Sequence, residues 1–123
     1  MDKQKIFENA KNQNPMLRVY DYHGITEEQF EEQYKNIPVH IKAYAKETLI
    51  VEYYNKGWKP NWNNTKEHKY HVWFCFDGKF RLSCVLYDFS ASICSARLCF
   101  KEEKDAFEAV EVFFEVFKES RTF

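Results

Sequence analysis

The feature that most constrains the fold of this chain is the change in hydrophobic period at Lys69. Before this residue, apolar side chains recur every three to four positions, as in an α-helix; after it, they alternate with polar ones, as in a β-strand. Asp77-Gly78 lies between two alternating runs, residues 70–75 and 80–86. This dipeptide is typical of a hairpin turn. The chain must therefore combine helices with an antiparallel hairpin.

The register of the hairpin follows from its two faces. A two-residue loop would mix Val72 and Phe74 with charged residues, whereas a three-residue loop over 76–78 gathers the apolar side chains on one face. Because a slip of one residue exchanges the faces, we expect the three-residue loop. The expected pairs are Phe74–Phe80, Val72–Leu82 and Tyr70–Cys84.

The other face of the expected hairpin carries Trp73 opposite Arg81, where a cation–π contact can form. In the same register, Cys75 and Cys84 point to opposite faces, so we expect no disulfide between them.

Two short elements are expected near the amino terminus. Residues 3–12 have the spacing of a short helix, and residues 16–22 alternate as in an edge strand. Within a single domain of residues 1–123, we expect residues 1–25 to form a loosely attached arm.

Two better-defined helices follow this segment. Thr26 and Gln29 have the spacing of a capping box at a helix start, and Pro38 ends that helix and begins the next, at about 38–55. Gly57 is the expected C-cap of the second helix. The apolar stripe expected to face the core consists of Ile41, Tyr44, Ala45, Thr48, Leu49 and Val51.

Residues after the hairpin complete the expected architecture. Residues 95–100 alternate as a third strand, and residues 102–119 have the period of a long amphipathic helix. The apolar stripe of this helix consists of Ala106, Phe107, Val110, Phe113, Phe114 and Phe117. The predicted fold class is α+β: N-terminal helices, a three-stranded antiparallel meander, and a C-terminal helix packed on the sheet.

Charge and composition argue against several classes of protein. The formal net charge is -1, whereas proteins that bind duplex DNA usually carry a basic excess. No apolar run is long enough to span a membrane, and the first residues do not lead into a signal-peptide segment. We therefore expect a cytoplasmic protein without membrane contact, with reduced cysteines.

The residues that could carry chemistry do not form a recognisable motif. The spacings of the histidines and cysteines do not match a structural zinc site, and no phosphate loop or nucleophile motif is present. We expect no catalytic residues, no metal and no cofactor. The potential zinc ligands are His68, His71, Cys75, Cys84, Cys94 and Cys99.

The segment from Lys56 to His71 is the best candidate for binding. It interleaves aromatic rings with lysines, as in surfaces that bind single-stranded nucleic acid. A structural role competes with this interpretation: Trp58, just past a helix end, is expected to be largely buried, and Trp62 to lie at the edge. Together with two hairpin residues, the candidate binding residues are Trp58, Lys59, Trp62, Lys66, Lys69, Trp73 and Arg81.

Three motifs resemble a family of small proteins encoded by prophages and mobile elements of Bacteroides-like bacteria. They are Gly-Trp-Lys-Pro-Asn-Trp at 57–62, Tyr-Asp at 87–88 and Arg-Leu-Cys-Phe-Lys at 97–101, within a match over residues 39–119. The chain has Cys-Ser-Ala at 94–96, where Gly-Ser is common in the family. The resemblance implies an origin in a mobile element and supplies no catalytic residues.

These observations favour a non-enzymatic accessory protein that works through protein contacts, with another protein or with itself as a homodimer. The alternative is weak binding of single-stranded nucleic acid by the Lys56–His71 segment. An enzyme is the least favoured class.

Overall fold

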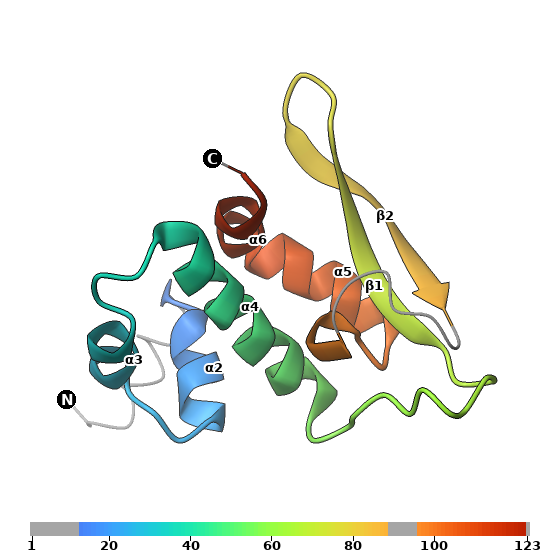
Figure 1. Cartoon of the computed structure of the whole chain (residues 1–123), viewed down its shortest axis with the longest axis horizontal. Coiled ribbons are helices and arrows are strands. Elements are labelled where there is room, and N and C mark those ends of the chain that lie inside the picture. Colours follow the sequence, from blue (N-terminus) through green and yellow to red (C-terminus); the bar gives the residue numbers. More distant parts are fainter. Residues whose placement is uncertain (1–12, 89–95, 123) are drawn as a thin grey trace.

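The computed structural model describes residues 13–88 and 96–122 and confirms the α+β class (Figure 1). The predicted helix at 3–12 and Cys94 lie outside the described residues. The helices are α2 (Met16–Tyr22), α3 (Glu27–Gln33), α4 (Val39–Asn55), α5 (Glu103–Val112) and α6 (Phe114–Arg121), the 3-10 turn is η1 (Ala96–Leu98), and the strands are β1 (Lys69–Phe76) and β2 (Phe80–Asp88).

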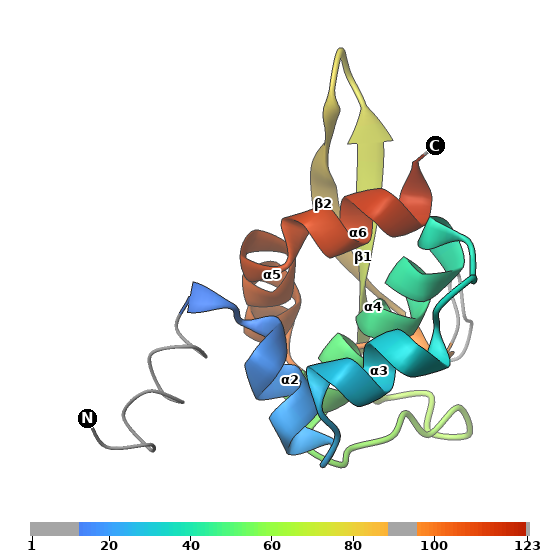
Figure 2. The same cartoon turned by 90° about the vertical axis from the view of Figure 1, so that its left-hand side faces the viewer.

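Helix α4 runs through the middle of the molecule (Figure 1). Helix α2 packs on one side of it and α5 and α6 on the other, and α5 also contacts the hairpin. The end of the hairpin that carries the turn projects beyond the helices (Figure 1, Figure 2). The most deeply buried apolar residues are Val19, Phe30, Ala43, Ile50, Val51, Cys99, Phe100, Ala106, Ala109 and Phe117.

The predicted edge strand at 16–22 is wrong, because this segment is helix α2. Met16, Val19 and Tyr20 have the spacing of one helical face, and all three are buried in the main core. Tyr20 also contacts Phe30 of α3, with ring centroids 5.2 Å apart. Residues 16–22, which belong to the predicted loose arm, therefore pack into the core.

The helix boundaries before the loop agree closely with the sequence. The capping box is present: Thr26 Oγ1 accepts a hydrogen bond from Gln29 N at 3.1 Å, and Gln29 Oε1 accepts one from Thr26 N at 2.9 Å. Pro38 precedes α4, as predicted. At the other end, the C-cap is Lys56 rather than Gly57, and both residues have positive φ.

The predicted inner face of α4 is correct only in part: Val51 is buried and Ala45 and Leu49 pack against the core, but two residues of the stripe are exposed. Ile41 is 47% exposed and Tyr44 is exposed as well, whereas Ala43, Glu47 and Ile50 are buried. The expected stripe does not include Glu47, and burial of an unpaired carboxylate would be costly. This carboxylate is paired, so the helix is rotated relative to the prediction.

Glu47 is bound by the last turn of α6. It is 1% exposed, and its two carboxylate oxygens each lie 2.7 Å from a guanidinium nitrogen of Arg121. Ser120 Oγ donates a further hydrogen bond at 2.8 Å. The Arg121 guanidinium also lies over the ring of Phe74, 4.8 Å from its centroid. This pair ties α4 to α6 and to the hairpin.

The hairpin has a three-residue loop, but its register differs from the prediction. The loop is 77–79, so Phe76 pairs with Phe80 and Phe74 with Leu82. A bulge at Ser83 then shifts the register, and Trp73 pairs with Cys84. As a result Val85, not Cys84, joins Leu82 against the core.

The predicted third strand is wrong for the residues that the structure describes. Ala96–Leu98 form the turn η1, and only Phe100 pairs, in a single antiparallel bridge to Tyr70 of β1. Asn55, at the end of α4, holds this segment: its Nδ2 donates to Cys99 O at 2.8 Å, and its Oδ1 accepts from Lys101 N at 3.0 Å. Two side-chain hydrogen bonds therefore replace the ladder of a strand.

The predicted helix at 102–119 is two helices, α5 and α6, separated at Phe113. Packing of this region on the sheet is confirmed, because Phe114 contacts Phe80 at 5.6 Å and Phe117 contacts Phe74 at 5.7 Å between ring centroids. Because of this break, not every residue of the predicted apolar stripe faces the core, and Phe107 is exposed.

Candidate interaction surfaces

The loop from Trp58 to Trp62 borders a hollow of about 630 Å³ beside the end of α4. Both tryptophan rings are half-buried, so Trp58 is less buried than predicted. Trp58 N donates to Asn55 O at 3.0 Å, which holds the loop against the helix end. The hollow is lined by Tyr22, His23, Val51, Glu52, Asn55, Gly57, Trp58, Lys59, Pro60, Trp62 and Arg97.

The charged groups of this hollow are centred on Glu52. His23 Nδ1 lies 3.8 Å from one of its oxygens and Arg97 Nη1 3.4 Å from the other. His23 Nε2 lies within hydrogen-bond distance of Leu49 O, at 2.9 Å. Lys59 is exposed at the rim. The hollow thus offers aromatic rings and a mixture of charges.

Lys69, one of the predicted binding residues, is 0% exposed. Its ammonium donates to Asn64 O and Glu67 O, each at 3.2 Å, and lies 3.3 Å from the Glu67 carboxylate. It also lies over the Trp62 ring, 5.1 Å from the centroid. Lys69 is therefore a structural cation that holds the loop together, and its charge is not presented to a ligand.

Glu67 is the acidic centre of this loop. The Asn61 backbone N–H donates to its carboxylate at 2.8 Å, and this bond, with the nearby Lys69 ammonium, holds the pKa of Glu67 below its ordinary value of 4.5. Because its pKa is lower in the folded than in the unfolded state, ionised Glu67 stabilises the fold above about pH 4.5. This stabilisation is lost as the pH falls through the folded pKa.

We therefore expect the wild-type chain to lose more stability than Glu67→Gln between about pH 6 and about pH 3. Urea midpoints followed by tryptophan fluorescence measure the difference. Glutamine keeps a hydrogen-bond acceptor for Asn61 N but does not titrate. Equal losses in the two chains would show that the carboxylate does not stabilise the loop.

The remaining predicted binding residues lie apart from the hollow or at its margin. Trp73 lies on the hairpin opposite Cys84, not Arg81. Arg81 lies opposite Cys75, and its guanidinium donates to Asp77 at 2.9 Å, so the expected cation–π pair is replaced by an ion pair. Lys66 is exposed on the loop. The seven predicted residues therefore divide between the loop and the hairpin.

The bulge also changes the position of the cysteines. Because it shifts the register by one residue, Cys84 shares a face with Cys75, contrary to the prediction, and both are free thiols. Within residues 13–88 and 96–122, no three His, Cys, Asp or Glu side chains are grouped so as to hold a metal ion.

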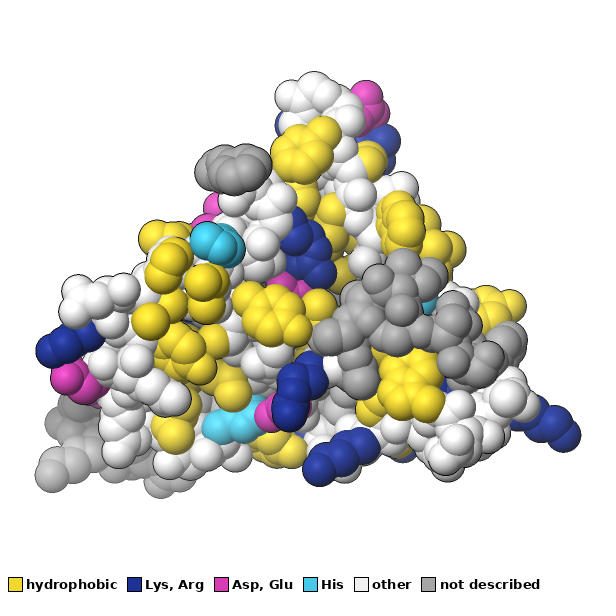
Figure 3. All heavy atoms as spheres, in the orientation of Figure 1, with side chains coloured by type: hydrophobic (Ala, Val, Ile, Leu, Met, Phe, Trp, Pro, Cys, Tyr) yellow, Lys and Arg dark blue, Asp and Glu magenta, His cyan; other side chains and the backbone are white. Residues whose placement is uncertain are grey.

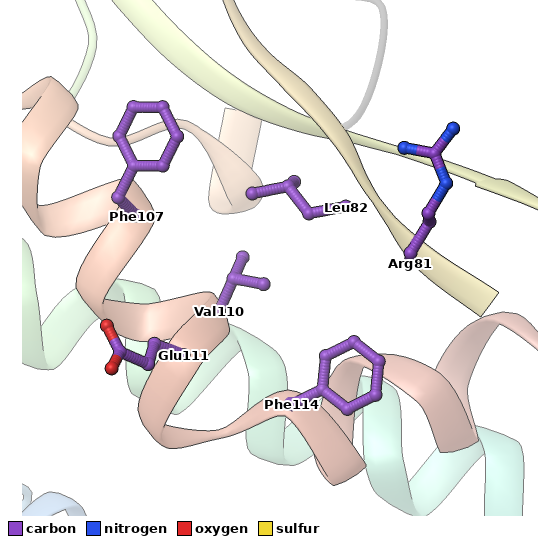
Figure 4. A pocket seen from close by; sticks show the side chains of 6 residues that line it. All are labelled: Arg81, Leu82, Phe107, Val110, Glu111 and Phe114. Carbon is purple, nitrogen blue, oxygen red and sulfur yellow. The ribbon is translucent and has the colours of Figure 1, made fainter.

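A second hollow, of about 380 Å³, lies between β2 and the helices α5 and α6 (Figure 4). Leu82 and Val110 form its apolar floor, Phe107 and Phe114 stand at its ends, and the Arg81 guanidinium points away from it. Phe107, predicted to pack on the sheet, is largely exposed here. Arg81 and Glu111 are its charged lining residues.

A surface that the sequence does not predict lies on α4. Ile41 and Tyr44, three positions apart on one side of α4, are exposed, and we call this side the α4 outer face; Ile37 and Val39, just before and at the start of the helix, are exposed as well. Hydrophobic side chains gather over the first turns of α4 and the neighbouring α2 and α3 (Figure 3). The stripe predicted to face the core contains Ile41 and Tyr44, and their exposure is a difference from the prediction.

Comparison with known proteins does not assign the chain to a family. No protein-family model matches it, and neither the curated proteins nor the solved structures gave a match. In the described part of the chain, no helix is both long and apolar enough to cross a bilayer.

Proposed function

We propose that this chain is a non-enzymatic, cytoplasmic accessory module that binds another protein through the α4 outer face. The observation that supports this proposal is the exposure of Ile41 and Tyr44 on one side of α4, where hydrophobic side chains gather over the first turns of the helix (Figure 3). Single exposed apolar residues are ordinary, but contiguous ones mark interaction sites. The resemblance to mobile-element proteins supports the same proposal, in which the partner belongs to the element or its host.

The surroundings of the α4 outer face fit a protein partner. Lys42 and Glu31 form an ion pair beside it, and His40 is exposed on the same turn. An apolar centre with a polar rim is typical of protein interfaces. Burying one such apolar side chain contributes about 1.5–3 kcal/mol, so a few of them supply substantial affinity.

Binding of single-stranded nucleic acid is the second candidate. Trp58, Trp62, Lys59 and Arg97 all line one hollow, where a base could stack and a phosphate could meet a cation. Burial of Lys69 and pairing of Arg97 with Glu52 reduce the free positive charge of this surface. We therefore rank it below protein binding.

The experiment is affinity capture from cells that naturally contain the chain, with Ile41→Glu as the test variant. Val112→Glu is the matched control, because Val112 is 43% exposed and Ile41 47%, and both lie on helices. We expect wild type and Val112→Glu to capture the same protein, and Ile41→Glu to capture it at least about tenfold less, since one apolar contact exceeds 1.4 kcal/mol.

Equal capture by Ile41→Glu would refute the α4 outer face as the binding site. If nucleic acid is captured instead, and Trp62→Ala abolishes its capture while Ile41→Glu does not, the second candidate replaces the first. Thermal melts of each variant establish that it is folded.

A further inference from the structure

The hollow beside the end of α4 has aromatic walls that are already fixed in position. The Trp58 side chain donates a hydrogen bond to the Glu67 carboxylate, and the Trp62 ring lies over the buried ammonium of Lys69. The Asn61 backbone N–H donates to the same carboxylate at 2.8 Å. Both indole rings that line the hollow are thus held by the loop itself. Such ordering in advance lowers the cost of binding a ligand between them.

The rings at this hollow already carry cations of the chain itself. The Lys69 ammonium lies 5.1 Å from the ring centroid of Trp62, and the Lys56 ammonium lies 4.6 Å from that of Tyr22. A second cation brought to such a ring is repelled by the first. An organic cation is therefore a poor ligand for this hollow, whereas a planar ring that stacks on an indole meets no such repulsion.

The cations at the rim fit a ligand with one anionic group. Arg97 is 71% exposed, and its contact with Glu52 is long, at 3.4 Å. Lys59 is exposed as well, and no carboxylate of residues 13–88 or 96–122 pairs with it. Two exposed cations suffice for one phosphate, whereas a strand of nucleic acid requires cations along several phosphates.

Glu52 supplies hydrogen-bond acceptors at the same hollow. Its carboxylate is 44% exposed, and its contacts with His23 and Arg97 are longer than ordinary hydrogen bonds, at 3.8 and 3.4 Å. The carboxylate therefore has lone pairs available to hydroxyl or amine donors of a ligand. A ligand that combines a planar ring, such donors and one anionic group matches the rings, Glu52 and the two cations together.

We propose that this hollow binds a nucleoside monophosphate as a free small molecule. Its base stacks on an indole ring of the 58–62 loop, its ribose hydroxyls donate to Glu52, and its phosphate is bound by Lys59 and Arg97. The volume of about 630 Å³ lies within the range of about 300–1,000 Å³ that is usual for small-molecule sites. This site is separate from the α4 outer face and does not depend on the protein binding proposed there.

Titration with adenosine monophosphate, followed by tryptophan fluorescence and by calorimetry, tests this proposal. We expect saturable quenching at one ligand per chain, weaker binding of adenosine, and no quenching by inorganic phosphate. Lys59→Gln should weaken binding of the nucleotide about threefold to fivefold, the usual range for one exposed ion pair, and leave binding of adenosine unchanged. Lys66→Gln is the matched control, because Lys66 is exposed on the same loop but does not line the hollow.

Short oligoadenylates with a 5′-phosphate distinguish a free nucleotide from a strand. We expect them to bind no more tightly than adenosine monophosphate. Affinity that rises with strand length and falls steeply with salt would overturn the proposal in favour of nucleic-acid binding. So would the absence of both quenching and heat with the nucleotide, or equal weakening in Lys59→Gln and Lys66→Gln. Ile41→Glu should bind the nucleotide like the wild type, so this proposal and the proposed function can fail separately.

Discussion

Glu47→Ala is expected to lower the free energy of unfolding by up to about 3 kcal/mol, because it removes a 1% exposed carboxylate from its pair with Arg121, whose guanidinium is 25% exposed and loses its counter-charge. The loss includes both guanidinium contacts of Arg121, each at 2.7 Å, and the acceptor of the Ser120 hydroxyl. A domain of this size has a total stability of only about 5–15 kcal/mol, so the variant should be partly unfolded at mild temperature.

The matched control is Glu32→Ala. Glu32 also forms an ion pair, with Lys35 at 3.2 Å, but both side chains are largely exposed. Exposed pairs of this kind contribute about 0–1 kcal/mol. Urea titrations of both variants give the comparison. If Glu47→Ala costs no more than Glu32→Ala, the pair between α4 and α6 is not a stabilising element of the fold.

Phe117→Ala is the second substitution with a large expected effect. The Phe117 side chain is fully buried on α6, and its ring lies 5.7 Å from that of Phe74 and 5.3 Å from the Arg121 guanidinium carbon. Removing a buried phenylalanine ring costs about 3–5 kcal/mol, from lost burial and from the cavity left behind.

Phe107→Ala is its control within the same predicted stripe. Because Phe107 is largely exposed beside the hollow of Figure 4, its loss should cost less than about 1 kcal/mol. Denaturant midpoints of Phe117→Ala and Phe107→Ala, measured under the same conditions, give the two stability losses to be compared. Equal costs for the two phenylalanines would mean that the helix faces are wrongly placed.

Features set by neighbouring residues could be predicted from the sequence. The capping box at Thr26, the boundary at Pro38 and the turn near Gly78 each depend on the chemistry of a few adjacent residues, and all three are present. The helix-on-sheet packing also follows from the phenylalanine spacing that places Phe114 and Phe117 on the hairpin.

Features that depend on distant partners could not be predicted in this way. The orientation of α4 is set by Glu47, whose partner is 74 positions away. Asn55 holds Cys99 O and Lys101 N in place of a strand ladder, across 44 and 46 positions. The bulge at Ser83 lets Val85 reach the core, which alternation alone does not indicate.

The same limit applies to the candidate surfaces. Composition indicates the Trp58–Trp62 loop as a candidate surface, and the loop borders a hollow. Composition could not show that Lys69 is buried beneath Trp62, or that Ile41 and Tyr44 lie outside the core. The burial of Lys69 and the exposure of Ile41 and Tyr44 both depend on how the segments pack. The α4 outer face can be identified only when the residues of α4 that face the core are known.

The pairing of Glu47 with Arg121 also has a consequence during protein synthesis. The ribosome adds about 5–20 residues per second, so the 74 positions between the two residues take roughly 4–15 s to make. Throughout that interval the Glu47 carboxylate of α4 has no counter-charge, and Phe117 has not yet been added to pack against the hairpin. The core can close only after residue 121 has been added, so this domain completes its folding after most of its chain has left the ribosome rather than stepwise during translation.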